Sequence, residues 1–145
     1  MAAWFLKISQ ALSKNIASWV DCSERNSMKL ARMAEILEAE VICGHEKLDI
    51  DIRMAVASDM MSDVLANTDG GQVLISGLCT VHTVVTARIL DLDAIIFVRG
   101  KTPTAEMIES AAQDGIALLR TCCTMYTACG ELYKNGLAGS RRIDV

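Results

Sequence analysis

The chain has 145 residues, a length that suits one domain with its own hydrophobic core. Hydrophobic residues make up 52% of it and charged residues 22%, which excludes an intrinsically disordered chain. The formal net charge of −4 excludes a broad basic surface, so we expect no nucleic-acid partner.

The segment 1–27 predicts an amphipathic helix appended to the rest of the chain. Its apolar residues recur at spacings of three or four, namely Trp4, Ile8, Leu12, Ile16 and Trp19. Lys7 interrupts this run, which argues against a membrane span and a secretory signal. Three interpretations stay open: a helix that docks on the domain, a helix for a membrane surface or a partner, and a segment upstream of a true start at Met28. We favour an appended helix or a start-site extension over a functional anchor.

A domain over 28–139 is predicted from short apolar segments that alternate with longer amphipathic ones. Helices are predicted over 28–37, 59–68, 81–91, 103–115 and 124–136. Strands are predicted over 39–44, 52–58, 72–76, 92–98 and 116–121. This alternation is typical of an α/β fold with three layers, in which helices cover both faces of a mainly parallel sheet of about five strands. A turn at 69–71 and a frayed tail over 140–145 complete the prediction.

The helix ends carry predicted capping residues. Ser58 or Asp59 is expected to cap the helix over 59–68. Thr102 is expected as the N-cap of a later helix whose first residue is Pro103. Gly115 fits the position just after the end of that helix.

The carboxyl ends of the predicted strands form the candidate binding edge, because ligands of such sheets usually bind there. The predicted ends are Gly44, Ser58-Asp59, Ser76-Gly77, Arg99-Gly100 and Thr121. The candidate ligand-binding residues at this edge are Ser58, Asp59, Ser76, Gly77, Thr80, Arg99 and Lys101. Among them, Arg99 and Lys101 are placed to meet an anion at the start of the following helix.

The triplet Gly100-Lys101-Thr102, between a strand and a helix, imitates the end of a P-loop. A P-loop needs G-x-x-x-x-G-K-[ST], but five residues before Gly100 the chain has Ile95. Too few loop residues remain to surround a phosphate with backbone amides, and Pro103 offers no amide hydrogen. The sequence therefore argues against a nucleotide site of this type.

No other group of residues has the spacing of an active site. Cys79 and His82 could form a nucleophile pair, but no third orienting group lies near them in the sequence. Asp59 and Asp63 stand four apart on one predicted helical face, where a cap and a solvated carboxylate are the simpler interpretation. The six cysteines show no C-x-x-C spacing and indicate reduced thiols in a cytoplasmic protein. We expect no catalytic residue, no metal site and no cofactor.

Four segments together resemble a single DRTGG domain: "VICGHEKLDIDIRMAVASDMMSDVLAN", "VLISGL", "ILDLDAIIFVRGKTPTAEMIESAAQDGIALLRT" and "TMYTACGELYKNGL". The resemblance runs from Met28 to about Gly139. It implies an α/β fold like that of the N-terminal domain of HPr kinase/phosphorylase. Related domains precede the catalytic part of some phosphotransacetylases and lie between the CBS modules of some pyrophosphatases. The resemblance therefore implies a regulatory or assembly module rather than a catalyst.

The chain departs from this family at the sequence that gives the family its name. Where Asp-Arg-x-x-Thr-Gly-Gly is expected, residues 49–55 read "DIDIRMA", and only Asp49 matches. A ligand that used the arginine, the threonine or the paired glycines is not expected to bind here in the same way.

The first functional hypothesis is a non-enzymatic regulatory domain. It would bind a small anionic metabolite or nucleotide, or a partner protein, and act as a homodimer or higher homo-oligomer. The alternative is a pure assembly module whose exposed apolar helices form the interface, which a mean hydropathy of +0.31 favours. The third hypothesis is a phosphoryl- or acyl-transferase.

Overall fold

The computed structural model describes residues 27–68 and 72–139, together with Ala3. The helix predicted over 1–27, the turn at 69–71 and the tail over 140–145 lie outside the described residues, apart from Ala3 and Ser27. No helix in the described part of the chain is long and apolar enough to cross a membrane.

Six strands form the central sheet, in the order β2-β7-β6-β5-β4-β8. Their bounds are β2 (Glu40–Cys43), β7 (Ala117–Arg120), β6 (Ala94–Phe97), β5 (Val73–Ser76), β4 (Met54–Ala57) and β8 (Ala138–Gly139). Neighbours from β7 to β8 run parallel, whereas β2 runs antiparallel to β7. The predicted mainly parallel sheet is confirmed, and β8 is a strand that the sequence did not predict.

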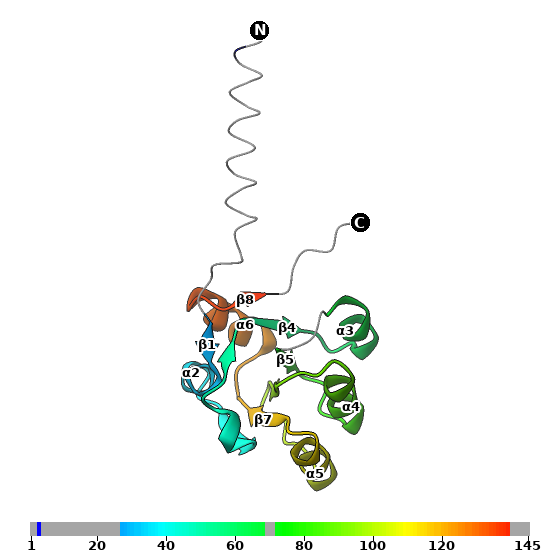
Figure 1. Ribbon diagram of the computed structural model, residues 1–145. Coiled ribbons are helices and arrows are strands. Elements are labelled where there is room, and N and C mark those ends of the chain that lie inside the picture. The colour runs from blue at the N-terminus through cyan, green and yellow to red at the C-terminus, as the bar shows by residue number, and fades with distance from the viewer. Residues whose placement is uncertain (1–2, 4–26, 69–71, 140–145) are drawn as a thin grey trace.

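Helices cover both faces of this sheet, so the predicted three-layer α/β architecture is confirmed (Figure 1). The helices are α2 (Leu30–Ile36), α3 (Met61–Asn67), α4 (Val81–Ile89), α5 (Ala105–Gln113) and α6 (Met125–Lys134). The connections from β4 to β5, from β5 to β6 and from β6 to β7 each move one strand in the same direction across the sheet. Because crossover connections between parallel strands are right-handed, α3, α4 and α5 lie on one face. The return from β7 to β8 crosses the other face, where α6 lies with α2.

Alternate residues of the central strands supply two separate cores, one for each face. The core with α3, α4 and α5 includes Leu74, Ile95, Phe97, Val84 and Met107. The core with α2 and α6 includes Ile75, Ile96, Leu119, Met33 and Leu132. β5 and β6 are buried on both faces, which explains their apolar runs over 73–75 and 94–97.

A small second sheet changes the predicted start of the first helix. β1 (Met28–Lys29) pairs antiparallel with β3 (Asp51–Ile52), so the helix predicted from Met28 begins only at Leu30. The prediction was wrong because this strand pairing, which depends on distant residues, overrides the helical pattern. The strand predicted over 52–58 is likewise divided between β3 and β4.

The predicted N-cap of α5 was also wrong, by two residues. The N-cap is Thr104, whose hydroxyl accepts a hydrogen bond from the amide of Met107 at 3.3 Å. Thr102 instead accepts a hydrogen bond from Nη1 of Arg120 at 2.7 Å. At the other end of α5 the prediction is confirmed, because Gly115 follows the C-cap with a φ of +66°.

Gly44 lies at the opposite edge of the sheet from the one predicted. Because β2 is antiparallel, its carboxyl end lies beside the amino end of β7. Gly44 has a φ of +80° there, and an added Cβ would lie 2.6 Å from Cα of Ala117, so only glycine fits. A short 3-10 helix, η2 (His45–Lys47), follows it.

Candidate functional site

The predicted ligand-binding residues lie at the carboxyl edge of β4, β5 and β6, which are parallel neighbours. Ser58 and Asp59 follow β4, Ser76 ends β5, and Gly77 and Thr80 lie between β5 and α4. Arg99 and Lys101 lie between β6 and α5. Hydrogen bonds join four of these residues, Asp59, Ser76, Gly77 and Arg99, which we call the Asp59 cluster.

Three donors converge on the carboxylate of Asp59. Its Oδ1 accepts hydrogen bonds from the amide of Gly77 at 2.6 Å and from the hydroxyl of Ser76 at 3.2 Å. Its Oδ2 accepts a hydrogen bond from Nη2 of Arg99 at 3.3 Å. An amide, a hydroxyl and a guanidinium on one anion make a charge-assisted arrangement that fixes the position of the carboxylate.

These donors keep the carboxylate ionised. Burial acts to raise the pKa of Asp59, but the Gly77 amide, the Arg99 guanidinium and the Ser76 hydroxyl together hold that pKa below its ordinary value. The side chains of Asp59 and Arg99 remain 47% and 44% exposed. The ion pair is therefore charged at neutral pH and open to a ligand from solvent.

The local backbone is shaped around the guanidinium of Arg99. A Cβ on Gly77 would lie 1.8 Å from Nη2 of Arg99, so a glycine leaves the space that the guanidinium fills. Arg99 itself has a φ of +57°, in the left-handed region, which costs a non-glycine residue about 1–3 kcal/mol. Its amide offsets this strain by donating to the carbonyl of Cys123 at 2.8 Å.

Backbone amides at the Gly100-Lys101-Thr102 triplet are not free to bind phosphate. The amides of Arg99, Gly100 and Lys101 donate, at 2.8 to 3.3 Å, to the carbonyls of Cys123, Thr121 and Val98 respectively. A P-loop leaves such amides pointing at its ligand. These three amides could therefore not hold an anion, and the triplet could contribute only side chains to its binding.

Lys101 is a second cation at this edge, and it makes no ion pair with any described residue.

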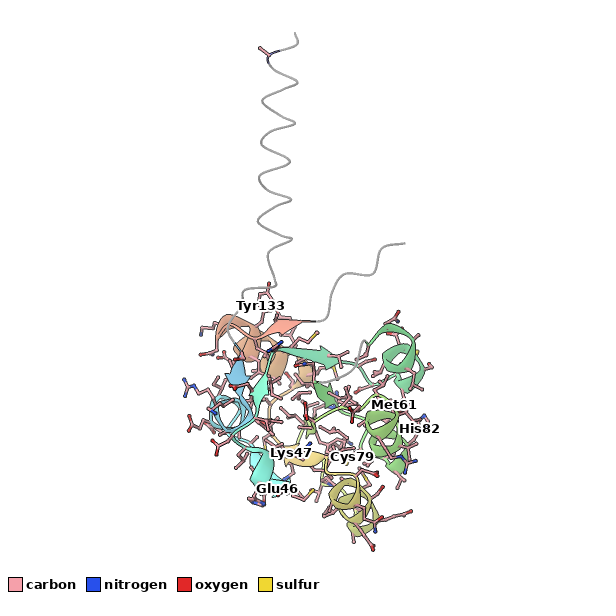
Figure 2. The ribbon with its side chains drawn as sticks, viewed as in Figure 1. Glu46, Lys47, Met61, Cys79, His82 and Tyr133 are labelled. Carbon is pink, nitrogen blue, oxygen red and sulfur yellow. The ribbon has the colours of Figure 1, made fainter. Side chains whose placement is uncertain are left out.

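The thiol of Cys79 is not activated as a nucleophile. Burial raises the pKa of the Cys79 thiol, and the charge of Lys101 opposes this only in part. Cys79 is therefore a protonated thiol at neutral pH. Figure 2 shows Cys79 toward the middle of the molecule and His82 on α4 further out, and no hydrogen bond joins them within the described chain. Their geometry does not make an activated nucleophile.

The start of α3 differs from its prediction. Its N-cap is Met60, with no side-chain cap, and Ser58 instead accepts a hydrogen bond from the Met60 amide at 3.0 Å. The carboxylate of Asp59 accepts hydrogen bonds within the Asp59 cluster, while Asp63 accepts a hydrogen bond from Nδ2 of Asn67 at 2.9 Å. Asp59 therefore lies before α3 and does not share a helical face with Asp63, contrary to the prediction. Across residues 27–68 and 72–139, no three or more His, Cys, Asp and Glu side chains are grouped to hold a metal ion.

Two parts of this region were missed from the sequence. Arg120 at the end of β7 forms an ion pair with Glu40 of β2, because the antiparallel direction of β2 brings its first residue to the carboxyl edge. A cavity of about 400 Å³ also lies beside the outer edge of β4, and residues of α3 and α6 line it. Of the predicted site residues only Ser58 lines it. No local sequence signal marks it, because β8 has only two residues.

Comparison with known proteins bears on the fold. No protein-family model matches the chain, and no curated protein matches it. Among solved structures, the chain is similar to the CBS and DRTGG domains of the regulatory region of Clostridium perfringens pyrophosphatase, crystallised with its activator diadenosine tetraphosphate. The TM-score is 0.61 and the identity 18%, over 78% of this chain and 51% of that one. The chain has a DRTGG-like fold. The chain thus spans about half the length of that regulatory region, and at this identity the likeness concerns the fold alone.

Proposed function

We propose that this chain is a non-catalytic regulatory domain that senses a small anionic metabolite or nucleotide at the carboxyl edge of its sheet. The observation that carries the proposal is the Asp59 cluster. Its amide, hydroxyl and guanidinium are the donors that proteins use to bind phosphate and carboxylate groups. The carboxylate of Asp59 fills this anion site from within the chain.

An anionic ligand would act by competing with that internal carboxylate. It would take the donors of Gly77, Ser76 and Arg99, and Lys101 would add a second positive charge. Release of Asp59 would then free the turn that leads into α3, which Asp59 now ties to β5. A ligand that binds only the released state shifts the population toward that state by its difference in affinity. This exchange gives a regulatory readout without any chemical step.

The structural neighbour supports the class of ligand. That regulatory region binds diadenosine tetraphosphate, an anionic nucleotide that activates its enzyme. Since this chain corresponds to about half of that region, the proposal extends to anionic ligands as a class rather than to that nucleotide.

The experiment is a thermal shift measurement with adenine and guanine nucleotides, diadenosine tetraphosphate, acyl phosphates and coenzyme A. A ligand at 100 times its Kd adds about 2.7 kcal/mol to the free energy of unfolding, which raises Tm by several degrees. Arg99→Ala and Lys101→Ala should each remove the shift. Lys134→Ala, which changes an exposed lysine on α6, is the matched control and should keep it. The proposal fails if no member of the panel gives a saturable shift, or if the shift survives Arg99→Ala.

A second candidate function is homo-oligomeric assembly. Several large apolar side chains are exposed, namely Met60 (64%), Ile89 (63%), Tyr126 (90%) and Tyr133 (56%). Met60 lies at the start of α3, Ile89 on α4 and the two tyrosines on α6, and burial of these side chains would favour an interface between copies. Sedimentation of the wild type and of a Gly100→Ala, Lys101→Ala double variant separates the two functions, because the variant should lose ligand binding and keep any assembly. Turnover of ATP or acetyl phosphate by the pure protein would instead favour a transferase.

A further inference from the structure

A groove runs along the outer edge of β4 because β8 covers only part of that strand. β8 pairs with Met54 and Ala55, and no described strand pairs with Val56 and Ala57 on that side. α3 flanks the gap on one face of the sheet and α6 on the other (Figure 1). The resulting cavity of about 400 Å³ is here called the β4–β8 groove. Its volume lies in the range that small-molecule sites occupy.

The walls of the groove are mainly apolar. Val56 of β4, Val64 of α3 and Leu132 of α6 contribute from three elements, and Leu137 closes the side next to β8. Val64, Leu132 and Leu137 belong to the two cores, so these walls are rigid. Tyr133 lies on α6 at the end of the molecule where β8 lies, as Figure 2 shows, and adds an aromatic ring to the lining.

One charge faces this apolar space, and it is negative. Among the described lining residues Asp63 is the only charged side chain. It accepts a hydrogen bond from Asn67 and forms no ion pair with the described chain. An anion is therefore repelled from the β4–β8 groove, whereas a cation finds a carboxylate there that pairs with no cationic side chain of the described residues.

A second polar group points to a ligand independently of this charge. The hydroxyl oxygen of Thr68, another lining residue, is buried and has no hydrogen-bond partner among the described residues. Buried hydroxyls are nearly always hydrogen-bonded, because burial without a partner costs free energy. A ligand with a polar group at this position would supply the missing bond.

We infer that the β4–β8 groove binds a small organic cation, an aromatic or branched aliphatic body that carries a protonated amine. The apolar body lies against Val64 and Leu132, the ammonium group pairs with Asp63, and the hydroxyl of Thr68 takes a further hydrogen bond. This ligand is opposite in charge to the anion of the Asp59 cluster. The two sites therefore select different molecules, although Ser58, which lines the groove, is the neighbour of Asp59 in the chain.

The test compares three probes of one shape by NMR titration of the full chain: benzylamine, benzyl alcohol and benzoate. Benzylamine should give saturable shifts of amide signals from β4, α3 and α6, and benzyl alcohol should bind about fivefold more weakly, as expected for loss of a partly exposed ion pair. Benzoate should not shift these signals. Asp63→Asn should reduce benzylamine affinity to that of benzyl alcohol, and Glu109→Gln, which changes an exposed carboxylate on α5, should leave it unchanged.

Ala57→Phe gives a second way to block the groove without touching either core, since Ala57 lines the groove and is exposed. Circular dichroism and Tm verify that each variant is folded. Equal binding of amine and alcohol, benzylamine binding that survives both Asp63→Asn and Ala57→Phe, or the absence of any saturable shift with benzylamine would overturn the inference. None of these outcomes depends on anion binding at Arg99, so the two sites are tested separately.

Discussion

The carboxyl edge of the sheet and the β4–β8 groove are two exposed regions that meet at Ser58, yet they differ in how their polar groups are satisfied. At the edge, the carboxylate of Asp59 is held by three donors, and its charge is balanced by Arg99. In the groove, the hydroxyl of Thr68 has no partner within the described chain, and the charge of Asp63 is not balanced there.

A binding site can thus be prepared in two ways. A site already filled by a side chain of the protein binds by exchange, so the ligand releases something when it enters. A site with unsatisfied groups binds by addition, and the ligand stabilises the fold without displacing a contact. The first kind suits a switch and the second suits a receptor of fixed shape.

The largest expected effect concerns the apolar wall of the groove. Leu132 is 1% exposed and belongs to the core under α6. Leu132→Ala should lower the free energy of unfolding by about 2–5 kcal/mol, because it removes buried methyl groups and leaves a cavity. Leu65→Ala is the matched control, since Leu65 is 38% exposed on α3, and it should cost less than about 1 kcal/mol. Urea denaturation followed by circular dichroism measures both, and equal costs would show that the wall is not part of the core.

A smaller effect is expected from pH at the carboxyl edge. Because the folded pKa of Asp59 lies below its ordinary value, its contribution to stability is present at neutral pH and is lost as pH falls through that pKa. The difference in unfolding free energy between wild type and Asp59→Asn should therefore shrink between pH 7 and pH 3. A difference that stays constant with pH would contradict the assigned hydrogen bonds.

The smallest effect is predicted for Thr68→Val in the groove. Valine has nearly the shape of threonine and lacks the hydroxyl that has no partner. The substitution should leave the free energy of unfolding within about 0.5 kcal/mol of wild type or raise it slightly. A loss well above 1 kcal/mol in urea denaturation would mean that the hydroxyl is already satisfied.

The sequence predicted the carboxyl edge much better than the groove, for physical reasons. The end of a buried strand is marked locally, where an apolar run stops, so Ser76 and Arg99 could be placed at one edge of a parallel sheet. The direction of a strand has no such mark. β2 was expected to be parallel and is antiparallel, which moved Gly44 to the far edge and brought Glu40 to Arg120.

The groove could not be predicted because it depends on the length of β8, which leaves part of β4 without a neighbouring strand. β8 has two residues and no apolar run, and its pairing with Met54 and Ala55 is set by the return of the chain over α6. The role of Asp59 was only partly predictable. Its place at the edge follows from the sequence, but its three donors come from residues 17 to 40 positions away.

We propose that Asp59 occupies an anion site which a ligand takes over. Calorimetric titration of wild type, Asp59→Ala and Arg99→Ala with an anionic ligand found in the thermal shift panel tests it most directly. Removal of the competing carboxylate should tighten binding about tenfold in Asp59→Ala, equivalent to about 1.4 kcal/mol, whereas Arg99→Ala should abolish binding. Weaker binding by Asp59→Ala, in a variant shown by circular dichroism to be folded, would contradict the exchange and make Asp59 an ordinary ligand contact.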